Sequence, residues 1–583
     1  MKLPASANQG FVQEPPVLQN QYEDDPALQG ILFHYLPHSE FAAVTGDLKN
    51  LGQRTITDIL VLGDNAEQHH PTLTQYDHWC KRIDKLETSE GWRALKGVAA
   101  EEGLIAIGYE RKLRQFSRVY QFAKLYVAGP SMAMYTCPLA MTDGAARLIE
   151  LHGTQDMKKT AFTRLTSRDP AKFWTSGQWM TERPGGSDVG GTETEAVQSS
   201  DGRGWLISGF KWFSSATDSD MTFLLARTRD QSTGSVREGS RGLSLFYAKL
   251  RDSEGNLNGI RVHRLKNKFG TKALPTAELE LDNLPGSMVG SEHRGVATIA
   301  VILNITRIHS ALCTTSSLRR SYAIAKSYAE KRVVFGKLLS TQPLHLATLA
   351  DIDMTLRGAM QLLFFAVLLL GESECHPGES RRALSGTLLR ITTPLLKMWV
   401  CHEAMPAITE ALEACGGQGY MEETGIARQL RDAQVNSIWE GTTNVQALDL
   451  LRVVGPLFPV YRKKVFELVS HDALLRQPVS VVKDALEYVQ KVIIAMQSWE
   501  RDQQQAKARL LGFAMARILI GALLIDHGIY LQREGHDDAE ASLVCAKRWC
   551  SNVGLLVGQL DAAPYSSKED LVLVYGKSSK AML

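Results

Sequence analysis

The chain has 583 residues, of which 44% are hydrophobic and 22% are charged, and its formal net charge is +2. This length predicts about three or four domains of roughly 150 residues each, and the composition is that of a globular protein with large cores. Because the charge is nearly balanced, composition gives no electrostatic reason to expect a nucleic acid or an acidic partner.

The N-terminal fifty residues lack the marks of a targeting segment. They contain two lysines and no arginine, and acidic residues stand at 14, 23, 24 and 25. A secretory signal begins with a positively charged region, and a transit peptide is rich in arginine and poor in acidic residues. We therefore expect a cytoplasmic protein, with a mitochondrial location as the alternative.

Residues 35 to 165 predict helices. Apolar residues recur at three-to-four spacing, as at Trp92, Leu95 and Val98, and short polar turns interrupt the pattern. Together with the extended segment before them, these helices form a predicted domain at residues 1–174.

The period of the apolar residues changes to two from about residue 175. Segments that alternate in this way, rich in aromatic and β-branched residues and separated by Gly, Asp and Asn turns, lie at 204–215, 220–229, 241–250 and 276–284. The pattern predicts a mainly antiparallel β domain at 175–284.

The helical period returns after Gly295, which predicts a helical bundle at 285–455. We place a boundary at PLFP, 456–459, and predict a C-terminal helical extension at 456–583, with two or three further helices at 460–560. The apolar run 362–370 is shorter than the roughly 18 residues of a membrane span, and 510–525 contains an arginine, so we expect buried helices and no span. The predicted fold class is multidomain and mostly α, with a central antiparallel β domain.

The eight cysteines contain no CxxC pair and no zinc-ribbon spacing. Cys401, Cys545 and Cys550 fall in helical text and fit packed thiols better than metal ligands. We expect reduced cysteines and no metal site.

Two candidate ligand-binding stretches lie in the β region. QWMTERPGGSDVGG, 178–191, has a glycine pair that lets a ligand approach the backbone, with hydroxyls at Thr181 and Ser187. In KWFSS, 211–215, two rings could wall a planar cofactor while Ser214 donates a hydrogen bond. The alternatives are a tight turn for the first stretch and ordinary core aromatics for the second. The glycine-rich stretch is neither a GxGxxG nor a Walker loop, so it does not predict Rossmann or P-loop chemistry.

Two further stretches lie in the second helical region. EKRVVFG, 330–336, places Arg332 after a long helix, where a guanidinium suits a diphosphate or a carboxylate. A surface charge is the alternative there. ACGGQGY, 414–420, supplies a glycine pair whose alternative role is to end a helix.

SIWEGTTN, 437–444, sets one carboxylate, Glu440, between an indole and a Gly-Thr-Thr turn. Ile438 and Trp439 predict an apolar wall beside it. Because an apolar surrounding raises the pKa of a carboxyl group, such a Glu can act as a base near the operating pH. A Glu that caps the helix that follows is the alternative.

The order of these stretches resembles the acyl-CoA dehydrogenase family of flavoproteins. TE-x-x-GGSD, KWFS, a helix ending in AEKR-x-x-FG, GGQGY and WEGTTN follow one another within residues 90–453. The resemblance implies an acyl-CoA dehydrogenase-like fold plus a C-terminal helical extension. It also implies FAD in a cleft between domains and subunits, and a homotetramer built as a dimer of dimers.

The resemblance also implies roles for particular residues. In the family, a hydroxyl matching Ser214 lies near flavin N5, an arginine matching Arg332 reaches the FAD of a neighbouring subunit, and Gln342 falls where a second such contact is expected. The residues implied at FAD are Gln178, Trp179, Met180, Thr181, Gly186, Ser187, Trp212, Phe213, Ser214, Arg332, Gln342, Gly416, Gly417, Thr442 and Asn444. Those implied at the substrate are Ser187, Arg307 and Gly441.

Two departures from the family pattern point to its AidB-like branch. Typical members read TEPxAGSD where this chain reads TERPGGSD, and about 140 residues follow Glu440. The branch is named for a bacterial alkylation-response flavoprotein whose extra C-terminal domain is associated with DNA binding. Residues 456–583 hold 16 Lys and Arg against 14 Asp and Glu, so we disfavour DNA as a partner.

The function implied by the resemblance is dehydrogenation of a medium- or long-chain acyl-CoA. In the family, the Glu matching Glu440 removes the α proton while the β hydride passes to flavin N5. The alternative is a protein that binds a fatty acid or acyl chain and regulates a partner with little turnover; a DNA-associated protector has the least support. The sequence leaves the first two open, because an acyl tunnel is lined by helix faces that resemble ordinary core.

Overall fold

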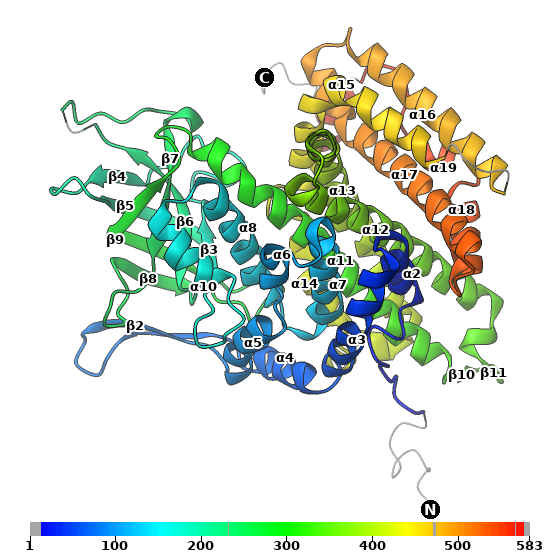
Figure 1. Ribbon diagram of the computed structural model, residues 1–583, viewed down its shortest axis with the longest axis horizontal. Coiled ribbons are helices and arrows are strands. Elements are labelled where there is room, and N and C mark those ends of the chain that lie inside the picture. Colours follow the sequence, from blue (N-terminus) through cyan, green and yellow to red (C-terminus); the bar gives the residue numbers. More distant parts are fainter. Residues whose placement is uncertain (1–12, 231, 470–473, 566, 577–583) are drawn as a thin grey trace, which may run out of the picture.

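A computed structural model describes residues 13–230, 232–469, 474–565 and 567–576. Helices come first along the chain, a β sheet follows, and long helices return (Figure 1). The sheet lies at the left of the view, and the last helices form its upper right. This confirms the expected fold class. The domain boundaries stay predictions, and the outer ends of the first and last expected domains, 1–12 and 577–583, lie outside the described residues.

The N-terminal region is largely helical, and α5 (Glu90–Glu101) shows why. Ser89 Oγ accepts a hydrogen bond from the backbone N–H of Trp92 (3.0 Å), which caps the helix, and Trp92, Leu95 and Val98 form its buried face. The other helices of this region are α2 (Pro26–Tyr35), α3 (His38–Arg54), α4 (Asp58–Gln68), α6 (Ala106–Glu110), α7 (Ser117–Ala128), α8 (Thr136–His152), α9 (Gln155–Met157) and α10 (Thr163–Leu165).

A β hairpin interrupts this region, so the expectation of helices throughout 35–165 is wrong there. β1 (Thr72–Tyr76) pairs antiparallel with β2 (Arg82–Glu87). Side chains of Gln75 and Arg82 each donate a hydrogen bond to the Val262 carbonyl (2.9 Å) and so fix the hairpin to the β domain. A two-stranded hairpin is marginal by itself, and the contact that stabilises this one is remote in sequence.

The β domain contains the four predicted alternating segments as β5, β6, β7 and β9. Its strands are β3 (Ser176–Trp179), β4 (Glu195–Gln198), β5 (Trp205–Ser215), β6 (Met221–Thr228), β7 (Leu243–Lys249), β8 (Ile260–Leu265) and β9 (Thr276–Val289). β6 pairs parallel with β3 and β4, and all other pairs in this sheet are antiparallel. Because β7 pairs with both β6 and β9, the sheet closes on itself and leaves few free edges.

The second helical region packs beside the sheet. Its helices are α11 (Gly295–Ala329), α12 (Pro343–Cys375), α13 (Glu379–Ala414), α14 (Ile426–Gln434) and α15 (Thr443–Leu468). A small hairpin, β10 (Val333–Val334) with β11 (Lys337–Leu338), connects α11 to α12. α15 runs without a break through Pro456 and Pro459, so PLFP interrupts no helix. Buried side chains along α15, such as Val454 and Phe458, offset the cost of proline in a helix interior.

The C-terminal extension contains more helices than the two or three expected. They are α16 (Arg476–Met496), α17 (Arg501–Glu534), α18 (Ala539–Trp549), α19 (Val553–Val557) and α20 (Ser567–Tyr575). α17 packs against α12, α13 and α15, so the extension is continuous with the bundle (Figure 1).

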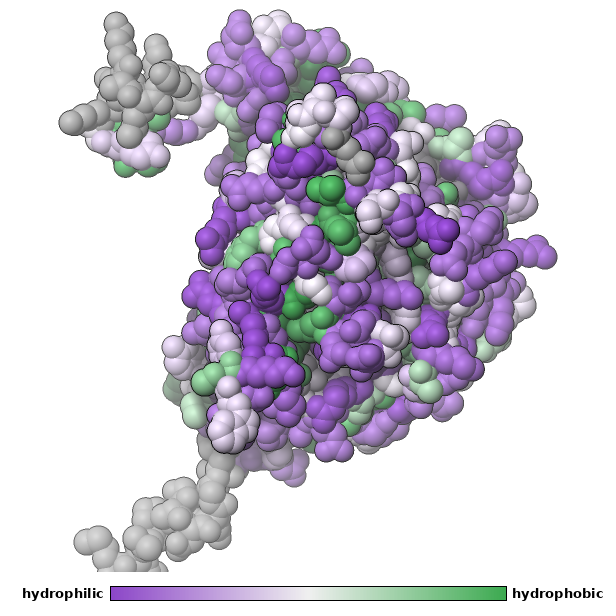
Figure 2. Space-filling view, turned by 90° about the vertical axis from the view of Figure 1, so that its left-hand side faces the viewer, coloured by the Kyte–Doolittle hydropathy of each residue, from purple (hydrophilic) through white to green (hydrophobic). Residues whose placement is uncertain are grey.

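Three helices of the described chain, α11, α12 and α17, are long and apolar enough by length and composition to cross a membrane. The length argument against a span is therefore wrong, because these helices extend well beyond the apolar runs at 362–370 and 510–525. The expected burial is present: 83% of the most apolar stretch lies inside the structure in both α12 and α17. Figure 2 shows the face on the side of the β sheet, where hydrophilic residues predominate and hydrophobic ones gather in a narrow central strip.

Candidate active site

The turn that carries Glu440 lies between α14 and α15 and has an uncommon backbone. Glu440 has φ = +58° and Gly441 has φ = +99°. A residue with a Cβ holds a positive φ only when its surroundings fix it, and such residues cluster at functional sites. The cap of α15 is Thr442, whose Oγ1 accepts a hydrogen bond from the N–H of Val445 (3.5 Å). The alternative that Glu440 caps this helix is therefore wrong.

Side chains from three helices hold the carbonyl groups of this turn. Arg307 of α11 donates from Nε to the Glu440 carbonyl (3.2 Å), and Gln446 of α15 donates from Nε2 to the same oxygen (2.9 Å). Lys397 of α13 donates to the Gly441 carbonyl. These contacts are the physical cause that fixes the strained backbone of Glu440.

Lys397 and Gln446 are not among the predicted site residues. Lys397 stands alone in the apolar text PLLKMWVC and is fully buried. Burial lowers the pKa of its ammonium group, while the nearby Cys401 and Glu440 oppose that shift. A single lysine inside an apolar helix is a signal that could have found it, because an unpaired buried ammonium is costly. Gln446 carries no comparable signal.

Burial removes water from the Glu440 carboxylate, and the surrounding hydrogen bonds and charges only partly replace the stabilisation that water would give. Burial raises the pKa of Glu440 above the usual value, and the Thr306 hydroxyl, the charges of Arg307 and Lys397, and the Gln178 amide oppose this rise. Thr306 Oγ1 lies 2.8 Å from Glu440 Oε2 and donates to it. A carboxylate with a raised pKa binds a proton more readily than an ordinary Glu, as a general base must.

The predicted apolar wall beside the Glu440 carboxylate is only partly present in the structure. Ile438 is 57% exposed, so its predicted place beside the carboxylate is wrong, whereas Trp439 is half-buried and donates from Nε1 to Asn436 (2.9 Å). Groups remote in sequence surround the Glu440 side chain instead, and Thr306 and Gln178 contact it.

Arg307, which the resemblance implies at the substrate, acts in this structure as a positioning residue for the turn. Besides the Glu440 carbonyl, it binds Asp449, with Nη1 3.0 Å from Oδ2. Asp449 also binds Arg390 (2.6 Å). Burial raises the pKa of Asp449, but hydrogen bonds and charge from Arg390 and Arg307 outweigh it, so the pKa falls below the usual value. A contact of Arg307 with substrate stays a prediction.

The end of β5 has the features of a wall for a planar cofactor. Trp212 is half-buried, Phe213 is 51% exposed, and Lys266 Nζ lies 3.2 Å from the centroid of the Trp212 ring. Ser214 Oγ is buried and has no hydrogen-bond partner among the described residues; the same holds for Gln178 Oε1 on the contacting strand β3. Buried polar atoms normally have a partner, so these two atoms fit a ligand with polar ring edges.

A buried ion pair supports the glycine-rich turn next to β5. Lys211 Nζ lies 2.6 Å from Glu182 Oε1, and both side chains are buried. Glu182 also accepts hydrogen bonds from Thr194 Oγ1 (2.5 Å) and from the N–H of Glu193 (2.6 Å). Glu182 is part of TERPGGSD and Lys211 is part of KWFSS. The sequence analysis did not predict their ion pair, because the pair joins a loop to a strand 29 residues away.

The turn itself presents backbone and short side chains. A Cβ added at Gly186 would lie 2.8 Å from Thr181 Oγ1, so this close approach requires glycine. Ser187 is exposed and Met180 is half-buried. Trp179 is buried in the β-domain core, where its Nε1 donates to the Ser215 carbonyl (3.3 Å), so only its backbone remains for the implied cofactor contact.

Four other predicted cofactor residues lie far from Glu440 within one chain. Arg307 and the end of α11 are separated by 22 residues, about 33 Å of helix, and Arg332 follows that end. Gln342 lies beside Arg332 at the β10–β11 hairpin, donating from Nε2 to the Val334 carbonyl (2.8 Å). Lys397, which contacts the Gly441 carbonyl, is 17 residues, about 26 Å of helix, before the end of α13, and Gly416 and Gly417 follow that end. Thr442 and Asn444, in contrast, lie next to Glu440 and are exposed.

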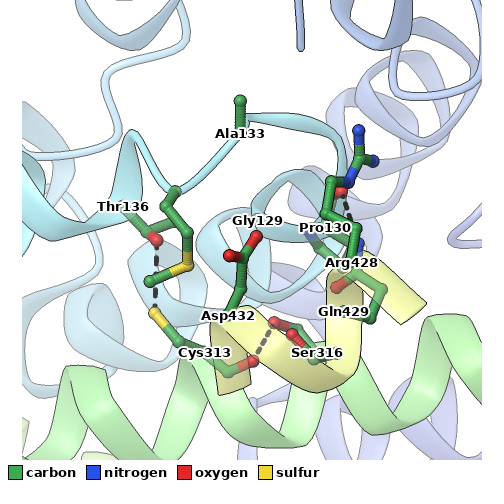
Figure 3. A pocket seen from close by; sticks show the side chains of 11 residues that line it. Gly129, Pro130, Ala133, Thr136, Cys313, Ser316, Arg428, Gln429 and Asp432 are labelled. Carbon is green, nitrogen blue, oxygen red and sulfur yellow. Dashed lines mark hydrogen bonds between the residues drawn. The ribbon is translucent and has the colours of Figure 1, made fainter. Parts of the chain in front are cut away.

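Two hollows in the described structure can be compared with the site, and the second includes Lys266, which contacts the Trp212 ring. Figure 3 shows a pocket in which Cys313 donates a hydrogen bond from Sγ to Thr136 Oγ1 (3.3 Å). Its free volume of about 10 Å³ is too small for an acyl chain as the side chains stand. A second hollow of about 170 Å³ lies beside Lys266 and is lined by His70, Pro71, Leu265, Lys266, Asn267, Lys268, Lys272, Leu274, Pro275 and Thr276.

The described part of the chain holds no group of three or more His, Cys, Asp or Glu side chains that could bind a metal ion. All eight cysteines are free thiols, and Cys401, Cys545 and Cys550 are buried, as expected for packed thiols.

Models of known families match this chain along most of its length. The acyl-CoA dehydrogenase middle domain matches residues 177–284 and the C-terminal domain of the same family matches 293–455. "Acyl-CoA dehydrogenase family member 11" of Caenorhabditis elegans is 45% identical over 94% of this chain and 90% of its own. The chain belongs to the acyl-CoA dehydrogenase family.

The flanking regions and the solved structures agree with this membership. The adaptive response protein AidB N-terminal domain matches 13–170, and the acyl-CoA dehydrogenase 11 C-terminal domain-like model matches 457–575. Putative acyl-CoA dehydrogenase AidB of Escherichia coli is 31% identical over 71% of this chain and 75% of its own, which confirms the AidB-like branch. The crystal structure of C. elegans ACDH-11 with C11-CoA superposes with a TM-score of 0.91 at 43% identity, covering 97% of each chain. The apo form of Bd2924 gives 0.82 at 42% identity, covering 89% of this chain and 100% of its own.

As an acyl-CoA dehydrogenase family member, the protein is an FAD-dependent oxidoreductase that acts on acyl-CoA. The residues present fit the cofactor. Two orphan buried polar atoms, on Ser214 and Gln178, border half-exposed rings at the end of β5, and Gly186 keeps the adjacent turn free of a side chain.

Proposed function

We propose that Glu440 is the catalytic base, which removes the α proton of a medium- or long-chain acyl-CoA thioester. The observation that carries this proposal is a single partly buried carboxylate with a raised pKa, held on a strained turn by Arg307, Gln446 and Lys397. The α proton of a thioester is weakly acidic, so a base of this kind needs both a raised pKa and a fixed position.

The residues around Glu440 keep its carboxylate ready for that proton. Thr306 donates to Oε2, which leaves Oε1 free of that donor, and the bonds to the Glu440 and Gly441 carbonyls prevent the turn from relaxing. We place FAD against Trp212, Phe213 and Ser214, where it supplies the acceptor for the hydride that leaves the β carbon. The turn at Gly186–Ser187 and the exposed Thr442 and Asn444 would hold it in the same chain.

The test is an anaerobic mixing experiment. The FAD-loaded protein is mixed with acyl-CoA esters of several chain lengths and, separately, with the matching free fatty acids, while the absorbance of the oxidised flavin is followed. We expect bleaching with medium- and long-chain CoA esters only, and the rates rank the chain lengths. Tight binding of free fatty acid with no bleaching by any CoA ester would instead support an acyl-binding regulator.

The Thr306 hydroxyl opposes the rise that burial causes in the pKa of Glu440. Thr306→Val removes a donor to the carboxylate, so the pKa of Glu440 rises further. Activity is present above this pKa and is lost as the pH falls through it, so the pH–rate profile should shift to higher pH by about one unit. The control is Thr315→Val on the same helix, whose buried hydroxyl donates to the Ala311 carbonyl (2.8 Å). An equal shift in both variants would contradict the prediction.

We also propose a homotetramer in which Arg332 and Gln342 contact the FAD of a second subunit. Apolar side chains are exposed beside them, including Phe335 of the hairpin (94%) and Leu344 at the start of α12 (84%), which a partner surface could cover. Within one chain the length of α11 keeps Arg332 away from Glu440. We further propose that the protein is located in the cytoplasm and that DNA is not its partner.

Arg332→Ala should weaken FAD binding by about ten-fold or more, because a charged hydrogen bond to a diphosphate is lost. FAD per subunit after gel filtration and the mass from ultracentrifugation are the measurements. Lys337→Ala, an exposed cation on the same hairpin, is the matched control and should leave both unchanged. Full FAD occupancy in the Arg332 variant at low free FAD would contradict the cross-subunit contact.

A further inference from the structure

In the described part of the chain, one hydrogen bond joins the C-terminal extension to the end of the Glu440 turn where we place FAD. Arg509 of α17 donates from Nη1 to Asn444 Oδ1 (3.2 Å). Asn444 lies two residues after the cap of α15, and 65 residues separate it from Arg509 in sequence. No other helix of the extension makes a hydrogen bond to residues 437–444 in the described part of the chain.

A second contact fixes the Arg509 guanidinium. Its Nη2 lies 2.9 Å from His402 Nε2 on α13. Arginine only donates, so this histidine nitrogen accepts and His402 is neutral. Burial lowers the pKa of His402, and the adjacent Arg509 charge lowers it further, which agrees with that assignment. The ring of Phe513 stacks on His402 (5.5 Å) and lies 5.4 Å from the guanidinium, one helical turn from Arg509.

The helix that presents Arg509 is held rigidly. Glu500 and Gln503 form a capping box that fixes the start of α17. One turn after Arg509, the α17 backbone at Gly512 packs against the Met398 side chain of α13, and a Cβ added there would lie 2.6 Å from Met398 Sδ. Arg509 therefore donates to Asn444 from a helix that is held in place. A flexible surface arginine would gain little free energy from the same hydrogen bond.

We infer that Arg509 is a positioning residue for the FAD site, and that the C-terminal extension thereby completes that site. By fixing the Asn444 amide, Arg509 keeps the start of α15 oriented toward the cofactor. This inference rests on the proposed placement of FAD against Thr442 and Asn444. It gives the extension a role within the active centre, in addition to its packing on the bundle.

The test measures FAD affinity, with no turnover required. Apoprotein of the full-length chain is titrated with FAD, and the quenching of flavin fluorescence gives Kd. We expect Arg509→Ala to raise Kd by about ten-fold, because the oriented amide is lost, while the Tm of the apoprotein changes little. A fall in apoprotein Tm with a Kd within two-fold of the original would show a merely structural role and overturn the inference.

The matched control is Arg517→Ala. Arg517 lies on the same helix, is 5.7 Å from the same Phe513 ring, and pairs with Glu403, the neighbour of His402, but makes no contact with residues 437–444 in the described structure. Its Kd should stay within two-fold of the original. An equal loss in both variants would mean that removing either arginine from this part of α17 weakens FAD binding, and would overturn the assignment to Arg509.

A double-mutant cycle tests the route through Asn444. If Arg509 acts by orienting the Asn444 amide, the double variant should have nearly the same Kd for FAD as Asn444→Ala alone. If the two fold-changes in Kd multiply, the residues act independently, which would contradict an effect of Arg509 through Asn444. Should Arg509→Ala fail to fold, Arg509→Gln, which keeps most of the packing, is read in the same way. A protein that binds FAD as expected but shows no bleaching with acyl-CoA would refute the dehydrogenase proposal and leave this inference standing.

Discussion

Glu440→Gln should lower the rate of flavin reduction by acyl-CoA by about 10²–10⁴-fold, the usual contribution of a positioned general base. The amide has almost the same shape as the carboxyl group and can still accept the Thr306 hydrogen bond, so the turn and the FAD site should remain intact. Anaerobic stopped-flow absorbance of the oxidised flavin measures the rate. Reduction at the original rate would refute the assignment of Glu440 as the base.

The stability of the same variant provides an independent check. The pKa of Glu440 is raised in the folded protein, so the stabilisation from this group is complete below its unfolded pKa and is lost as the pH rises through the folded pKa. Glu440→Gln, which carries no charge, should therefore have a higher Tm than the original protein at alkaline pH. The difference should disappear in acid. A higher Tm at acid pH only would contradict the raised pKa.

Lys211→Met should lower the free energy of unfolding by about 3–5 kcal/mol, because it leaves the Glu182 carboxylate buried without its charged partner. Burial lowers the pKa of Lys211, and the Glu182 charge opposes this shift. The charged form of each group is therefore stabilised by the charge of the other. Glu182 also holds the chain at Glu193 and Thr194, so its disturbance should loosen the Gly186 turn and weaken FAD binding. Urea unfolding and an FAD titration are the measurements.

Two further variants separate the ion pair from general effects of methionine. Lys249→Met replaces an exposed lysine of strand β7 in the same sheet and should change stability by less than about 0.5 kcal/mol. Glu182→Gln combined with Lys211→Met removes both charges and keeps a hydrogen-bond acceptor, so it should recover part of the loss. A double variant as unstable as Lys211→Met alone would contradict the buried charge as the cause.

The sequence was most informative where neighbouring residues determine the structure. Alternation at 204–215 and 220–229 predicted β5 and β6, because side chains of a strand alternate between faces whatever the strand packs against. The hairpin at 72–87 was missed because its stability depends on Val262, nearly 180 residues away. The helix through Pro456 was missed for a similar reason, since packing along α15 overrides the local preference of proline.

For the active site, sequence motifs were enough to predict the family, the position of Glu440 and the binding of FAD, because the informative residues of each motif are close together. The surroundings of Glu440 became known from the fold alone. Thr306, Lys397 and Gln178 come from three elements far apart in sequence, and Ile438, its near neighbour, points to solvent. Desolvation and hydrogen bonding act through space, so the pKa of a carboxylate follows from the folded surroundings, which no local pattern records.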